Sequence, residues 1–151
     1  MYNKILLGMD ESYNAIHAAK KAIEIQKREN SEVVGFHSIL HHLSELNLSF
    51  FNPKGLSDIK ALSIHNDYIQ RGEHILEDLD KIFKESKAKV ETRLIFDITP
   101  EDYIQYMIEE EGFDLVILGC KGHHSKLGRI FLGSIPRNVI NYVESDILLV
   151  R

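Results

Sequence analysis

The stretch of this chain with the clearest capacity for chemistry is rich in glycine and lies near its C-terminal end. Residues 118–136 read LGCKGHHSKLGRIFLGSIP. Gly119 and Gly122 let the backbone approach a ligand closely, because glycine has no side chain in the way. Gly133 and Ser134 stand where a last helix should begin, and the first N–H groups of a helix have no partner within it. Unpaired N–H groups, the helix dipole and a serine hydroxyl together favour a phosphate.

Two common phosphate sites are excluded by their spacing. No glycine-rich loop of this chain ends in Gly-Lys-Ser or Gly-Lys-Thr, so there is no Walker A motif. Residues 8–12, Gly-Met-Asp-Glu-Ser, do not have the dinucleotide-binding spacing. A different arrangement must hold the phosphates. Lys121, Lys126 or Arg129 can reach a terminal phosphate, although solvated surface charges would look the same in the sequence.

Other reactive residues do not form a recognisable site. The eight histidines include two adjacent pairs, but adjacent side chains point apart on most backbones, and no Cys or carboxylate completes a metal-binding spacing. We therefore expect no metal site, although His123 can contact phosphate. Cys120 is the single cysteine, so an intrachain disulfide is excluded. We interpret Cys120 as a small spacer in the loop. No side-chain catalyst stands out.

Five short apolar runs predict the strands that position this loop. They are residues 5–9, 33–36, 90–96, 115–118 and 147–150. Most lack a clean apolar–polar alternation, which is typical of parallel strands covered on both faces. The third run alternates with Glu91 and Arg93, so we expect it near an edge of the sheet.

Helical patterns separate these runs. Ser12 is expected to cap a first helix whose apolar stripe includes Ala15 and Ile16. A longer helix follows around residues 75–83, Thr99 caps the next one, and Gly112 ends it. The last helix carries Ile135, Val139, Ile140 and Val143. Alternating strands and helices predict an α/β fold in which an open parallel sheet lies between two helical layers.

The segment from about residue 41 to 66 looks too long and irregular for a tight connection. It contains Phe50 and Phe51, beside Pro53 and Gly55. Two interpretations stay open: an excursion that meets a partner, or a mobile lid.

Composition limits the class of protein. The 151 residues fit one domain, residues 1–151, with enough chain for a core. Eighteen basic and 23 acidic residues give a formal charge of −5, which gives no reason to expect nucleic acid or an anionic membrane as partner. The first apolar run is followed at once by Asp10 and Glu11, unlike a signal peptide or membrane span. We expect a soluble cytoplasmic protein.

The glycine-rich loop resembles that of the ATP-binding subgroup of the universal stress protein family. The family loop reads Gly, two residues, Gly, nine residues, Gly, then Ser or Thr. Here Gly119, Gly122, Gly133 and Ser134 fit this order, with ten residues rather than nine before Gly133. The likeness covers almost the whole chain, because residues 2–12, 110–119 and 146–151 also match the family.

The resemblance implies a Rossmann-like three-layer sandwich of the adenine-nucleotide alpha-hydrolase type, with strand order 3-2-1-4-5. Ligands bind such sheets where the strand order reverses, which places Asp10 across a crevice from Gly119. By analogy Asp10 contacts the adenosine and Ser38 borders the adenine. The expected nucleotide-binding residues are Gly8, Met9, Asp10, Ser38, Leu118, Gly119, Lys121, Gly122, His123, Gly133, Ser134 and Ile135.

The resemblance also implies a function. We expect binding of ATP or another adenine nucleotide, with or without magnesium, in a regulator that an unidentified protein partner recognises during stress. A homodimer would form by antiparallel pairing of the last strand, which contains Ile147, Leu148, Leu149 and Val150. Two alternatives stay open: a slow magnesium-dependent ATP hydrolase, and a dimeric interaction module that binds no nucleotide.

Overall fold

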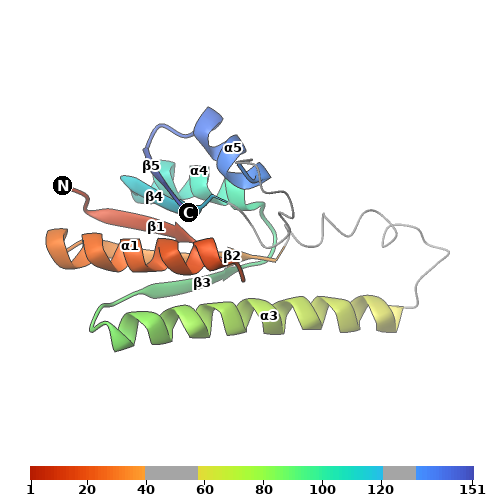
Figure 1. Cartoon of the computed structure of the whole chain (residues 1–151). Coiled ribbons are helices and arrows are strands. Elements are labelled where there is room, and N and C mark those ends of the chain that lie inside the picture. The colour runs from red at the N-terminus through yellow and green to blue at the C-terminus, as the bar shows by residue number, and fades with distance from the viewer. Residues whose placement is uncertain (40–57, 121–131) are drawn as a thin grey trace.

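The computed structural model describes residues 1–39, 58–120 and 132–151, with the backbone alone described over 58–63. Its strands are β1 (Lys4–Gly8), β2 (Glu32–Ser38), β3 (Glu91–Ile95), β4 (Leu115–Gly119) and β5 (Asp146–Val150). Its helices are α1 (Tyr13–Glu29), α3 (Asp58–Glu85), α4 (Pro100–Glu111) and α5 (Ser134–Tyr142). Strands and helices alternate along the described chain, as the sequence predicts (Figure 1).

The strands form one parallel sheet in the order β3-β2-β1-β4-β5. The central strand β1 pairs with β2 on one side and β4 on the other, so that Ile5 lies between Val33 and Leu115. This order is the one that the family resemblance implies. The predicted place of the third strand at an edge is also confirmed, because β3 pairs with β2 alone.

Helices cover both faces of the sheet. Figure 1 shows α1 and α3 on one side and α4 and α5 on the other. The side chains of β1 alternate between the two layers: Ile5 and Leu7 pack with α1 and α3, whereas Leu6 packs with α4 and α5. All three are fully buried, which is why the strand reads as a continuous apolar run. The predicted three-layer fold is confirmed.

The predicted helix ends are confirmed at three positions. The Ser12 hydroxyl accepts the N–H of Ala15 at 3.1 Å and caps α1. Thr99 caps α4 in the same way, followed by a proline at the first helical position. Gly112 ends α4 with φ of 70°, a left-handed conformation that glycine adopts without steric cost.

Two sequence-based predictions about helices are wrong. The irregular connection does not extend to residue 66, because α3 already begins at Asp58. Residues 58–71 contain no glycine or proline to interrupt a helix. The remainder of that connection, with Phe50 and Phe51, lies outside the described residues.

Ile16 was expected in the apolar stripe of the first helix, yet this residue is 37% exposed, and Ile140 of the last helix is 46% exposed. Alanines form most of the buried face of α1, and Ile16 lies at the margin of that face. In α5, burial centres on Pro136 and Val139, which leaves Ile140 at the boundary with solvent. Val143 is the C-cap residue of α5 and follows its last helical residue.

The amino ends of the strands are joined by one carboxylate. Asp114, just before β4, accepts the backbone N–H groups of Asn3 and Lys4 at 2.9 Å each, and the Asn3 side-chain amide at 3.1 Å. Partial burial disfavours the charged form of Asp114, but these hydrogen bonds outweigh burial and lower its pKa. Asp114 therefore fastens the start of β1 to the start of β4.

Candidate functional site

The sheet changes the direction of its connections between β1 and β4, and the candidate site lies at the carboxyl ends of these two strands. The chain leaves β1 toward β2 on one side, while β4 lies on the other side. Gly8 ends β1 opposite Phe36, and Gly119 ends β4 opposite Val150. Ligands of open α/β sheets bind at this kind of switch point. The structure thus brings Gly8 and Gly119 to one edge of the sheet.

Gly119 packs directly against the first turn of α1. A Cβ atom at this position would lie 3.0 Å from the backbone nitrogen of Ala15 and 3.0 Å from the Cβ of Asn14. This close approach gives Gly119 a packing role, which sequence reasoning did not foresee. The predicted contact between Gly119 and a ligand stays a prediction.

Asp10 lies in the turn between β1 and α1. Its Oδ1 accepts the backbone N–H of Ser12 at 2.8 Å, and Ser12 in turn caps the helix. In the described part of the chain, Oδ2 of Asp10 has no hydrogen-bond partner. Asp10 therefore orders the turn with one oxygen and presents the other at the carboxyl edge of the sheet.

The start of α5 is held at the end of β4. The N–H of Gly133 donates to the carbonyl of Cys120 at 3.1 Å, and the N–H of Cys120 donates to the carbonyl of Val150 at 2.8 Å. Gly133 is the N-cap residue of α5 and, as a glycine, has no side chain that could cap the first N–H groups of the helix. The N–H groups of Ser134 and Ile135 follow in the first turn, where the helix dipole is positive.

Ser38 and Met9 lie deeper than expected for residues that meet a ligand through their side chains. The Ser38 hydroxyl donates to the carbonyl of Ile98 at 2.9 Å, and Ser38 is buried. Met9 is also buried, and its carbonyl lies 2.7 Å from Nδ1 of His37. Ser38 was expected to meet the adenine through its backbone, and burial of its side chain is compatible with that expectation.

The other expected site residues divide into two groups. Leu118 packs its side chain into the core beneath α4 and α5, so only its backbone is available at the sheet edge. Lys121, Gly122 and His123 lie outside the described residues. Their roles stay predictions.

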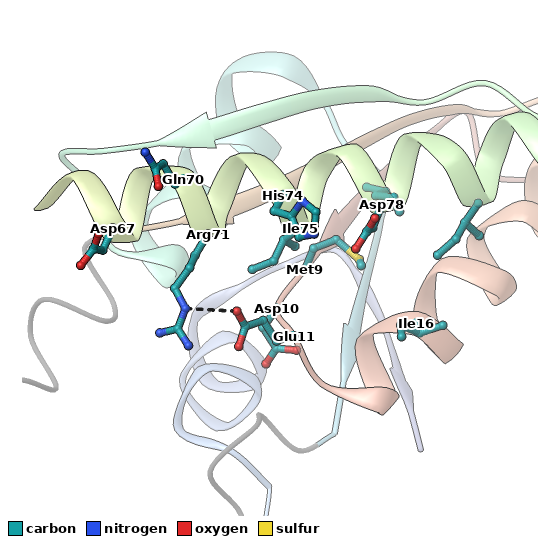
Figure 2. Close-up of a pocket in the computed structure, with 12 residues that line it drawn as sticks. Met9, Asp10, Glu11, Ile16, Asp67, Gln70, Arg71, His74, Ile75 and Asp78 are labelled. Atoms are coloured by element: carbon teal, nitrogen blue, oxygen red, sulfur yellow. Dashed lines mark ion pairs between the residues drawn. The ribbon is translucent and has the colours of Figure 1, made fainter. Parts of the chain in front are cut away.

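A cleft of about 740 Å³ opens beside Met9 and Asp10, between the β1–α1 turn and α3 (Figure 2). Its size is within the range of about 300–1,000 Å³ that is typical of small-molecule sites. The residues that line it are Met9, Asp10, Glu11, Ile16, Asp67, Gln70, Arg71, His74, Ile75, Asp78, Leu79 and Ile82. Its buried members are apolar, and its exposed members are polar apart from Ile16.

Sequence reasoning missed the α3 wall of this cleft. Asp67, Arg71, His74 and Asp78 recur at spacings of three and four, which places them on one face of the helix. That spacing was the available signal, but the same pattern is typical of any solvated helical face. Only the packing of α3 against the sheet shows that this stripe borders a cleft.

Metal ligation has no support in the described ranges. Within 1–39, 58–120 and 132–151, no group of three or more His, Cys, Asp or Glu residues could hold a metal ion. Over the same ranges, no helix is both long and apolar enough to cross a membrane.

Comparison with known proteins decides the family. The Universal stress protein family matches residues 1–151. This chain belongs to that family. Universal stress protein MJ0577 of Methanocaldococcus jannaschii is 26% identical over 157 residues, which cover 100% of this chain and 96% of the relative. The solved structure of MJ0577 matches with a TM-score of 0.76, covering 99% of this chain and 96% of that one.

Two further solved structures share the universal stress protein fold. One is the universal stress protein from Archaeoglobus fulgidus in complex with dAMP, with a TM-score of 0.68 and 19% identity over 99% of this chain and 98% of that one. The other is an Arabidopsis thaliana universal stress protein family protein with AMP bound, with a TM-score of 0.63 and 13% identity over 98% and 90%. The family resemblance and the expected fold are therefore confirmed.

Proposed function

We propose that this universal stress protein binds an adenine nucleotide, ATP in the first instance, at the carboxyl ends of β1 and β4. In this proposal the protein is a cytoplasmic regulator of a stress response, and nucleotide binding is what changes its state. The observation that carries the proposal is the attachment of α5 to β4 through Gly133 and Cys120, at 3.1 Å. This attachment keeps the positive end of a helix at the edge that also carries Asp10. The family relatives that hold dAMP and AMP add support for the ligand class.

The phosphates belong at the start of α5 in this proposal. The first turn of α5 contains no acidic residue, so nothing in it repels an anion. Ser134 and Ile135 supply backbone N–H groups, the Ser134 side chain adds a hydroxyl donor, and Pro136 adds no N–H that needs a partner. Gly119 and Gly122 would let the loop backbone approach the same phosphates, with Lys121 or His123 adding charge.

The nucleoside belongs near the end of β1. A carboxylate oxygen is a good acceptor for ribose hydroxyl groups, and Oδ2 of Asp10 is available for them in the described structure. Ser38 ends the neighbouring strand β2, so its backbone borders the same edge. We therefore assign the adenosine end of the ligand to the turn after β1.

The two edges of the sheet support a homodimer through β5. The β3 edge carries charged residues, and Arg93 binds Glu111 of α4 at 2.8 Å. Such charges disfavour pairing with a second sheet. The β5 edge has four consecutive apolar residues from Ile147 to Val150, all half-buried. We propose that this edge pairs with its counterpart in a second copy, and that a further protein recognises the nucleotide-bound dimer.

Isothermal titration with ATP, ADP, AMP and cyclic AMP, with and without magnesium, tests the proposed function. The informative variant is Asp10→Asn, because asparagine keeps the oxygen that accepts the Ser12 N–H while it removes the carboxylate charge. We expect about ten- to one-hundredfold weaker binding, since a hydrogen bond to a charged group contributes about 1.5–3 kcal/mol. Unchanged unfolding midpoints would show that the turn is intact.

A matched control removes a different exposed carboxylate. Glu24 of α1 pairs with Lys21 at 2.6 Å on the same helix and does not line the cleft. Glu24→Gln should leave the affinity unchanged. Absence of binding by the unaltered protein to all four nucleotides would contradict the proposed function.

A further inference from the structure

We propose that Arg71 of α3 packs its guanidinium group against the base of the bound nucleotide and so makes α3 one wall of the site. This inference rests on the proposed function, since it assumes that a nucleotide occupies the site. It assigns a role to a residue far from the glycine-rich loop.

The position of α3 is fixed next to Arg71 by a close contact with the sheet. A Cβ atom on Gly72 would lie 2.5 Å from Cδ1 of Leu94 and 3.0 Å from Cδ2 of His37. The helix can approach β2 and β3 this closely only because residue 72 has no side chain. One and two turns later, Ile75 and Leu79 are buried at the bottom of the cleft. The helix that carries Arg71 is therefore packed closely against the sheet.

Arg71 reaches across the mouth of the cleft. Its Nε lies 3.5 Å from Oε1 of Glu11 in the β1–α1 turn (Figure 2). The two side chains are 63% and 40% exposed. Exposed ion pairs of this kind contribute little to stability. Arg71 can therefore leave Glu11 for a ligand at small cost.

The charge of the cleft favours the base over the phosphates as the partner of Arg71. Four carboxylates line the cleft together with this guanidinium: Asp10, Glu11, Asp67 and Asp78. A phosphate placed among them would meet net repulsion, whereas a neutral base would not. The buried side chains of Met9 and Ile75 form an apolar floor of the cleft, as in most small-molecule sites.

The shape of the guanidinium suits this role. It is planar and weakly hydrated, and it stacks on aromatic faces, which a lysine ammonium does not do. The nucleoside end is already assigned to Asp10, which lines the same cleft. A base that extends from Asp10 toward α3 would therefore lie between the apolar cleft residues and Arg71.

The test compares ligands that differ only in their phosphates. Adenosine, AMP and ATP are titrated into the unaltered protein and into Arg71→Ala, Arg71→Lys and Lys84→Ala. Lys84 is the matched control, because it lies on α3, pairs with Asp80 and does not line the cleft. Arg71→Ala should weaken all three ligands by one common factor of about three to thirty, the range for guanidinium–aromatic contacts. Arg71→Lys should not restore the affinity, and Lys84→Ala should not change it.

Other results would overturn the inference. If Arg71→Ala weakens ATP far more than adenosine, and Arg71→Lys restores ATP binding, Arg71 contacts a phosphate. If Arg71→Ala leaves all affinities unchanged, Arg71 does not touch the ligand. In both cases the unaltered protein still binds nucleotide, so the proposed function stands. Failure of the unaltered protein to bind any of the three ligands would instead remove the proposed function and this inference together.

Discussion

Asp114 and Asp10 stand at opposite ends of the sheet, and the chain uses these two carboxylates differently. Asp114 receives N–H groups from Asn3 and Lys4 on both of its oxygens, at the amino ends of β1 and β4. Asp10 receives one N–H, from Ser12, and borders a cleft at the carboxyl end of β1. The first carboxylate is satisfied by its own chain, whereas the second keeps an acceptor for another molecule. The amino end of the sheet thus stabilises the fold, whereas the carboxyl end is the one that we propose binds a ligand.

The largest expected effect comes from truncating the two carboxylates in parallel. Asp114→Ala should lower the free energy of unfolding by about 2–3 kcal/mol, because it leaves backbone N–H groups without a charged acceptor. Asp10→Ala removes a single hydrogen bond and should cost about 1 kcal/mol or less. Urea denaturation at neutral pH measures both. Equal losses of unfolding free energy at the two positions would show that both carboxylates stabilise the fold to the same extent, which would contradict this prediction.

In nucleotide binding, we expect Asp10→Ala and not Asp114→Ala to show the larger effect. Nucleotide affinity should be unchanged in Asp114→Ala, whose site of change lies at the far end of the strands, and reduced in Asp10→Ala. Titration of the folded variants with AMP measures this difference. A loss of nucleotide affinity in fully folded Asp114→Ala would show that the amino and carboxyl ends of the sheet are coupled.

A smaller effect on the free energy of unfolding is expected at acidic pH, and it depends on Asp114. Its pKa is lowered in the folded protein, so its contribution to stability is present above the unfolded pKa of about 3.9. That contribution is lost as the pH falls through the folded pKa. The gap in unfolding free energy between the unaltered protein and Asp114→Ala should therefore stay constant from about pH 7 to 5 and narrow below about pH 4. Urea denaturation at a series of pH values tests this, and a gap that widens in acid would contradict it.

Local sequence signals predicted the fold well because they depend on neighbouring residues. The apolar runs became strands, and Ser12, Thr99 and Gly112 became helix ends as expected. The strand order came from the family resemblance, since no local signal specifies which strands become neighbours. The start of α3 was missed because the segment before it contains Pro53 and Gly55, which made the whole connection look irregular.

The candidate site was predicted only in part, for a different physical reason. Asp10 was assigned from the family resemblance and Gly133 from helix-end rules, and the structure brings both to the carboxyl edge of the sheet. The pairing of Arg71 with Glu11 joins residues that are distant in the chain. Such a contact depends on how closely α3 packs at Gly72, which no spacing in the sequence reveals.

Amide chemical shifts test directly whether this universal stress protein binds phosphate at the start of α5. Two-dimensional ¹H–¹⁵N spectra of the labelled protein are recorded during titration with AMP and, separately, with adenosine. The N–H signals of Ser134 and Ile135 should shift strongly with AMP and much less with adenosine, while those of Asn3 and Lys4 stay in place. Saturable AMP binding that leaves Ser134 and Ile135 unmoved, or that shifts them equally with adenosine, would contradict the claim.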